Sequence, residues 1–256
     1  MYSRIIFLLL IVVGAVISVG ALLFGHSLTT HASTTDSTVV WTDIFDVEEL
    51  DSKWSWIRED PNHWSLTNQL GFMQITVQHG SIWRETNDAK NLLLRNAPEG
   101  DFELETRLIF KPGHNFQFAG LLVYEDDDNW MRLGRAFCGF DPPICAGGNG
   151  IYYHHEEEGV DAGGTNYAMT TTVEGEAYLR IVRHGSVYTG YVSENGTNWT
   201  LVGTHKIASG MVPLKVGLIA ENMQDSQPQI PAEFDYFSLR YDQFDLYLPL
   251  ILNNKD

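Results

Sequence analysis

The sequence has 256 residues, a formal net charge of −17 at neutral pH and 44% hydrophobic residues. So large an acidic excess argues against nucleic acids and anionic membrane surfaces as partners, because both are bound through positive charge. The part of the chain after residue 32 is long enough to form one domain with a sizeable core.

The chain begins with a membrane-targeting pattern. Residues 5–24 form an uncharged apolar run that Arg4 precedes. This predicts either a signal peptide cleaved after Ala32 or a retained anchor whose N-terminus stays in the cytoplasm. Either way, we expect a secreted or cell-surface protein that contacts the membrane only through residues 1–32. The Ser- and Thr-rich residues 33–40 then predict a flexible leader.

Residues 41–241 alternate between short apolar runs and turn residues, with no sustained helical period. This pattern predicts a single all-β domain of two packed antiparallel sheets. The clearest expected strands are 70–77, 102–110, 116–124, 130–137, 177–183, 187–193, 214–220 and 233–241. The apolar tail at 242–256 is too short to cross a bilayer as a helix, and it predicts either a last edge strand or a surface-attachment segment.

Two cysteines and two charged clusters suggest local features. Export predicts a disulfide between Cys138 and Cys145 that closes a small loop. Residues 154–158 read His-His-Glu-Glu-Glu, but adjacent side chains on a strand point to opposite faces, so we interpret them as a solvated hairpin tip rather than a zinc site. The acidic residues 126–129 lack the glycine and distal glutamate of an EF-hand, which favours a solvated turn.

Four segments carry a family resemblance in their order and spacing. They are 54–61 (WSWIREDP) followed by 64–66, 91–98 (NLLLRNAP) with 101–103, 117–130 (QFAGLLVYEDDDNW), and 191–199 (YVSENGTNW) with 234–237. Together they resemble the concanavalin A-like sandwich at the C-terminus of β-xylosidases, which also occurs as a free-standing domain of unknown function in exported bacterial proteins. The resemblance covers about residues 41–241.

This resemblance implies a two-sheet antiparallel jelly roll of the lectin and glucanase type, with a concave sheet that faces a carbohydrate ligand. It also implies a structural calcium between the first and last strands, held by Asp235 together with Asp43 or Asp46. Fold analogy by itself does not establish function.

Sugars stack on aromatic rings while planar donors and carboxylates bind their hydroxyl groups. Strand alternation places Trp130 and Arg132 on one face, with Tyr124 across the intervening turn. Trp56 and Arg58 are two residues apart in the segment 54–61, so on a strand their side chains would point to the same face. We therefore expect a ligand site on the concave sheet, formed by Trp56, Arg58, Tyr124, Trp130 and Arg132.

The sequence leaves three functions open. The first is an exported, non-catalytic carbohydrate-binding domain. The second is a polysaccharide-active glycoside hydrolase, although the Glu-x-Asp-x-x-Glu strand of the related glucanases is absent. Its carboxylates would come from Glu59, Glu105, Glu125 or Glu221. The third is a structural or adhesive surface domain whose concave face is filled.

Overall fold

The computed structural model describes residues 33–140, 145, 147–161, 166–171, 175–208 and 210–247. Residues 35–245 form a compact unit, and the chain outside it is described only at residues 33, 34, 246 and 247, the ends of two strands. The predicted targeting segment at 1–32 and the part of the predicted tail beyond residue 247 lie outside the described residues. Within the described part, no helix is long and apolar enough to cross a membrane.

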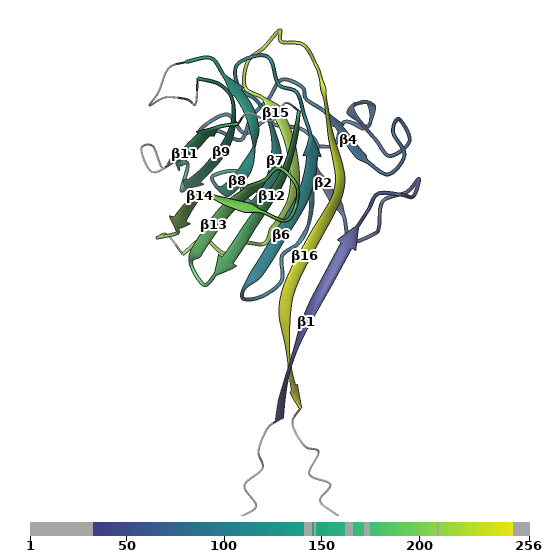
Figure 1. Cartoon of the computed structure of the whole chain (residues 1–256), viewed down its shortest axis with the longest axis vertical. Coiled ribbons are helices and arrows are strands. Elements are labelled where there is room, and N and C mark those ends of the chain that lie inside the picture. Colours follow the sequence, from purple (N-terminus) through teal and green to yellow (C-terminus); the bar gives the residue numbers. More distant parts are fainter. Residues whose placement is uncertain are drawn as a thin grey trace, which may run out of the picture. The chain divides into compact units, whose positions relative to one another are not determined.

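The unit is built from two eight-stranded sheets (Figure 1). Sheet A runs β14-β13-β12-β6-β16-β4-β3, and β1 also pairs with β16. Its strands are β14 (Trp199–Lys206), β13 (Val187–Ser193), β12 (Glu176–His184), β6 (Phe102–Ile109), β16 (Pro231–Tyr247), β4 (Met73–Thr76), β3 (Trp64–Ser65) and β1 (Ser33–Asp43).

Sheet B runs β10-β9-β8-β7-β15-β5-β2, and β11 also pairs with β9. Its strands are β10 (Val160–Asp161), β9 (Gly148–Glu157), β8 (Asn129–Cys138), β7 (Gln117–Asp126), β15 (Lys215–Asn222), β5 (Leu92–Asn96), β2 (Ser55–Ile57) and β11 (Tyr167–Thr170). The one helical element among the described residues is a single 3-10 turn, η1 (Pro61–His63). The predicted all-β jelly-roll sandwich is therefore confirmed.

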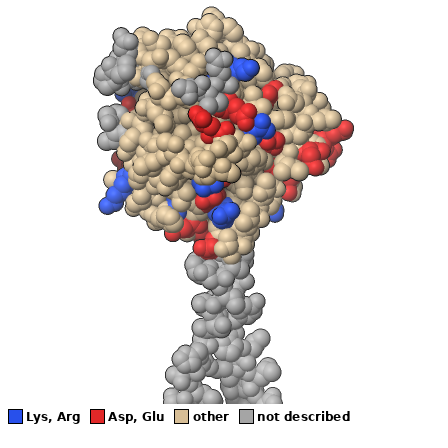
Figure 2. Space-filling model, viewed as in Figure 1, with Lys and Arg blue, Asp and Glu red and all other residues tan. Residues whose placement is uncertain are grey.

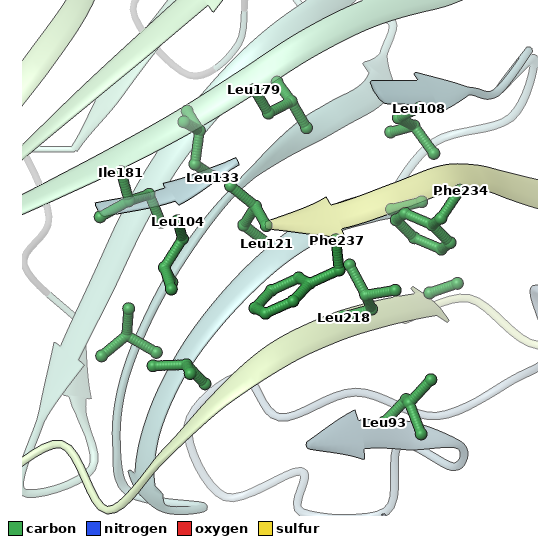
Figure 3. Close-up of a cluster of buried hydrophobic side chains, with 14 of the residues drawn as sticks. Leu93, Leu104, Leu108, Leu121, Leu133, Leu179, Ile181, Leu218, Phe234 and Phe237 are labelled. Atoms are coloured by element: carbon green, nitrogen blue, oxygen red, sulfur yellow. The ribbon is translucent and has the colours of Figure 1, made fainter. Parts of the chain in front are cut away.

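The main core fills the space between the two sheets. Alternation along β6 buries Leu104 and Leu108, while their neighbours remain half-exposed. Figure 3 shows these leucines beside Phe234 and Phe237 of sheet A, with Leu121 and Leu218 of sheet B completing the cluster. Burial of this apolar surface holds the sheets together, at about 25 cal/mol per Å² removed from water.

Surface charge follows the acidic composition. Figure 2 shows acidic side chains interspersed with basic ones on the face turned to the viewer. On the outer face of sheet A, the side chain of Arg107 lies 2.8 Å from Glu176 and 2.9 Å from Asp235, and that of Arg180 lies 2.6 Å from Glu105. Many of the few basic side chains are thus already paired with carboxylates.

Three local predictions can be compared with the structure. Cys138 and Cys145 form a disulfide, as predicted, with their Cα atoms 5.7 Å apart. Residues 33–40, assigned from the sequence to a flexible leader, are part of strand β1. The solvated hairpin tip predicted at residues 154–158 is confined to Glu158, which is exposed in the turn between β9 and β10. Residues 154–157 instead belong to β9, where they pair with β8 and, at the end, with β10.

Candidate functional site

The side of sheet B that faces away from the core carries a second cluster of aromatic and polar side chains. Alternation sends one set of side chains from β7, β8, β9 and β15 inward and the other set outward. The outward set, here called the outer face of sheet B, comprises Phe118, Leu122, Tyr124, Trp130, Arg132, Tyr152, His154, Glu156, Ile219 and Glu221.

A loop at residues 78–91, here called the covering segment, lies over this face. Ser81 and Ile82 are fully buried in it, and Ile82 packs with the apolar side chains of the outer face. The segment folds back on itself through backbone bonds from Asp88 and Ala89 to the carbonyl oxygen of Ser81. Gly80 permits this close approach, since its φ is +134° and a Cβ there would lie 2.8 Å from the carbonyl oxygen of Asp88.

Glu221 attaches the covering segment to the sheet. The side chain of Arg132 donates to its carboxylate, and both side chains are almost fully buried. Ser81 Oγ and the backbone amide of Ile82 also donate to Glu221, at 3.2 Å and 3.1 Å. A buried carboxylate requires such partners, because an unpaired charge in the interior is costly.

Glu156 forms a second attachment of the same kind. It has no exposed surface, and its Oε2 accepts a hydrogen bond of 2.8 Å from the backbone amide of Arg84. Burial raises its pKa above the ordinary value. Its other oxygen, Oε1, is buried without a hydrogen-bond partner among the described residues.

Between these attachments, the covering segment presents Trp83. The Trp83 ring lies 6.0 Å from the Trp130 ring and 5.5 Å from the His154 ring, while Ser81 Oγ accepts the Trp83 backbone amide at 3.0 Å. Burial, together with the nearby charge of Arg132, lowers the pKa of His154 to about 3, so the imidazole is neutral at physiological pH. Trp83 remains half-exposed, and the exposed Arg84 follows it.

The structure brings four of the five predicted ligand residues to this region. Tyr124 and Trp130 are directly opposite on neighbouring strands, and Arg132 follows on the same face. Arg58 joins them from the end of β2, because Asp127 accepts two hydrogen bonds from its guanidinium, at 2.7 Å and 2.9 Å, and one from Tyr124 Oη.

The exposure of these residues differs from the prediction. Trp130 is 0% exposed and Arg132 is 4% exposed, because the covering segment and Phe118 lie over them. The predicted exposed ring at Trp130 is therefore incorrect, and the ring that reaches the surface here is Trp83. Trp130 Nε1 is also buried without a hydrogen-bond partner among the described residues.

Trp56 lies apart from the other four. It pairs with Leu93, whose side chain points into the main core, and its ring packs 5.0 Å from that of Trp64. Trp56 and Arg58 do not point to the same face, as strand alternation would predict. Arg58 comes after the end of β2 and has a φ of +52°, which redirects its side chain.

The sequence predicted a calcium site at Asp235 with Asp43 or Asp46. Among the described residues, no group of three or more His, Cys, Asp or Glu side chains could hold a metal ion. Asp235 pairs with Arg107 at 2.9 Å. Asp43 accepts hydrogen bonds from Trp54 Nε1 and from the amide of Phe45. Calcium binding stays a prediction.

Two of the glutamates considered for hydrolysis, Glu105 and Glu221, lie on opposite outer faces of the sandwich. Glu105 is on the outer face of sheet A, where it binds Arg180 and Tyr236, whereas Glu221 is on the outer face of sheet B. Glu59 accepts from Trp64 Nε1, and Glu125 accepts from the amide of Val212. Packed sheets are about 10 Å apart, so carboxylates on their two outer faces exceed the separation of about 5–9.5 Å that glycoside hydrolysis requires.

The sequence left Trp83 equally open as a core residue and as a ligand platform, and the predicted site did not include it. The covering function of residues 78–91 was missed. One signal was available in the pair Ile82-Trp83. This apolar pair interrupts a long polar loop, and long ordered loops in compact domains are commonly functional.

Comparison with solved structures gives the same fold. The chain aligns with the GH43 protein BlXynB from Bacillus licheniformis at 20% identity and a TM-score of 0.67, covering 78% of this chain and 39% of that one. A Bacteroides ovatus GH43B of a xyloglucan locus aligns at 21% identity and a TM-score of 0.64, with coverage of 80% and 39%. The Bacillus licheniformis β-glucanase aligns at 13% identity and a TM-score of 0.53, with coverage of 78% and 97%.

The chain thus spans about two-fifths of the length of the GH43 proteins it matches. Among curated proteins, no sequence match was found. A family model for the β-xylosidase C-terminal concanavalin A-like domain matches residues 42–240, and the chain therefore belongs to this family.

Proposed function

We propose that this protein is an exported, non-catalytic carbohydrate-binding domain and that Trp83 is the centre of its binding surface. The observation that carries the proposal is a half-exposed indole held in place beside an exposed arginine. Sugar rings stack their C–H faces on such rings, and guanidinium groups donate to sugar hydroxyls.

The surroundings of Trp83 reduce the entropic cost of binding. Its ring rests on Trp130 and on His154, and its backbone is fixed by Ser81. The Arg84 guanidinium lies 5.9 Å from the Trp83 ring centroid and 3.5 Å from a carboxylate oxygen of Asp161. Little ordering is left for the moment of binding, which favours affinity in a small contact area.

The buried carboxylates favour binding over hydrolysis. Glu156 and Glu221 are the glutamates of the outer face, and each is buried and bonded to the covering segment. A glycosidase needs its two carboxyl groups free to approach the glycosidic bond. The related solved structures include GH43 enzymes and a xylan β-1,4-xylosidase from Bacillus halodurans, which makes xylan-derived oligosaccharides the first ligands to test.

The test is isothermal titration of the full-length chain with xylohexaose, followed by a wider glycan panel. We expect Trp83→Ala to weaken binding about tenfold or more, which corresponds to about 1.4 kcal/mol. Trp83→Phe keeps a smaller ring and should lose less. Release of reducing ends from xylan, measured in parallel, should be absent for wild type.

A matched control is Trp199→Ala. Trp199 is also half-buried and also contacts an arginine, since the Arg180 guanidinium lies 3.8 Å from its ring centroid, but it belongs to sheet A. Equal affinity loss in Trp83→Ala and Trp199→Ala would contradict the assignment of the site. Failure of the wild type to bind any glycan would overturn the function itself.

A further inference from the structure

A cavity lies away from the outer face of sheet B, beside the C-terminal end of β5. Its volume is about 320 Å³, near the lower end of the range of about 300–1,000 Å³ typical of small-molecule pockets. It is lined by Arg95, Asn96, Ala97, Pro98, Glu99, Leu239, Tyr241 and Asp242. Side chains from both sheets therefore meet in it, since Arg95 belongs to β5 and Tyr241 to β16.

Arg95 is the unusual member of this cavity. Alternation along β5 turns it toward the inside of the sandwich, where its guanidinium lies 3.5 Å from the Trp41 ring centroid and 6.0 Å from that of Trp54. The residue is only 9% exposed, and its Nε and Nη1 are buried without a hydrogen-bond partner among the described residues. Unsatisfied buried donors are rare and costly, so they indicate a missing acceptor.

The nearby carboxylates do not supply that acceptor. Asp43 and Asp51 are close enough to interact electrostatically with Arg95. However, Asp43 accepts from Trp54 Nε1 and the amide of Phe45, and Asp51 accepts from the amide of Lys53. The charge of Arg95 is thus partly balanced, while two of its guanidinium nitrogens have no acceptor in the described part of the chain.

We infer that this cavity is a subsite for a neutral saccharide, whose hydroxyl oxygens accept hydrogen bonds from Arg95 while its hydroxyl hydrogens are donated to Glu99 and Asp242. A hydroxyl group can donate and accept at once, so it satisfies a guanidinium and carboxylates in the same cavity. An anionic sugar fits less well, because Glu99 and Asp242 line the cavity and the chain carries a net charge of −17. The inference takes its ligand class from the proposed function but uses a different site.

The test is NMR of the full-length chain labelled with ¹⁵N-arginine and ¹⁵N-tryptophan, titrated with xylobiose. We expect the Arg95 Nε–Hε signal to shift on saturation, and the shift to persist in Trp83→Ala. In the double variant Glu99→Ala/Asp242→Ala, the dissociation constant read from the Arg95 signal should rise at least fivefold. Glu99 and Asp242 are exposed, and the hydrogen bond that the hydroxyl of Thr38 donates to Asp242, at 2.8 Å, is exposed as well, so this variant should change the melting temperature little.

Each result separates the two sites. A shift of the Trp83 indole signal with an unchanged Arg95 signal overturns the subsite and leaves the proposed function standing. A shift of Arg95 that occurs with galacturonate but not with xylobiose overturns the neutral ligand class. If xylobiose moves neither signal and Arg95→Lys changes only the melting temperature, the arginine is structural and the subsite does not exist.

Discussion

The Arg132–Glu221 pair shows how a single contact determines what the outer face of sheet B can do. Strand parity in the sequence correctly placed Arg132 and Trp130 on one face with Tyr124. It could not show that both would be covered, because Glu221 and Ser81 lie far from them in the chain and meet them only in the folded protein. Exposure depends on these long-range contacts, whereas parity is a local property.

Arg132→Met should destabilise the protein by about 3–5 kcal/mol, because it leaves Glu221 charged and buried without its counterion. The double variant Arg132→Met/Glu221→Gln removes both charges and should recover a large part of this loss. Urea unfolding at pH 7 measures both free energies. A single variant as stable as wild type would show that the pair contributes little to attaching the covering segment.

At the scale of elements, the sequence predicted strands of apolar composition well but missed a strand that has a polar run. The expected strand at 187–193 coincides with β13, and that at 102–110 differs from β6 by one residue. Strand β9 was missed because its polar run at 154–157 has the composition of a turn. Pairing with β8 and, at the end of the run, with β10 buries His155 and Glu156, and tertiary context thus overrides composition.

Two glycines that lie opposite each other on β7 and β8 allow these strands to pack closely, which can be tested by substitution. Gly120 and Gly134 face each other in the register, and a Cβ at Gly134 would meet the backbone of Ala119 and lie 2.5 Å from Phe118 Cζ. We expect Gly134→Ala to cost about 1–3 kcal/mol through overpacking. Gly113→Ala is the control, since a Cβ there meets nothing within 4 Å, and it should change stability by less than about 0.5 kcal/mol. Thermal unfolding of the two variants should therefore differ clearly.

At the scale of the whole molecule, the edge where the two sheets meet holds buried neutral histidines. His205 of sheet A is 2% exposed, and its ring lies 4.2 Å from the His155 ring and 4.5 Å from the Tyr153 ring of sheet B. Burial, and secondarily the nearby His155, lowers the pKa of His205 to about 4. The pKa of His155 is lowered as well, mainly by burial. Packing of the two sheets thus depends on these rings remaining uncharged.

Stability should therefore fall as the pH drops below the ordinary histidine pKa of about 6.5. Below that value the unfolded chain binds a proton at His205 while the folded protein does not, and this continues down to about pH 4. The expected slope is about 1.4 kcal/mol per pH unit for each such histidine, and His154 adds to it in the same direction. Glu156 opposes the trend at the acid end, because its raised pKa makes the folded state bind a proton first.

Urea unfolding between pH 7.5 and pH 4.5 measures this slope, and His205→Gln isolates one contribution to it. The variant removes one titrating group, so its free energy of unfolding should be lower than that of wild type at pH 7.5 but should fall less steeply toward pH 4.5. The difference in slope, rather than the difference in stability, reports on the buried imidazole, since any disruptive substitution lowers stability at every pH. Parallel curves for the two proteins would show that His205 titrates alike in the folded and unfolded states, and hence that it is not held neutral between the sheets.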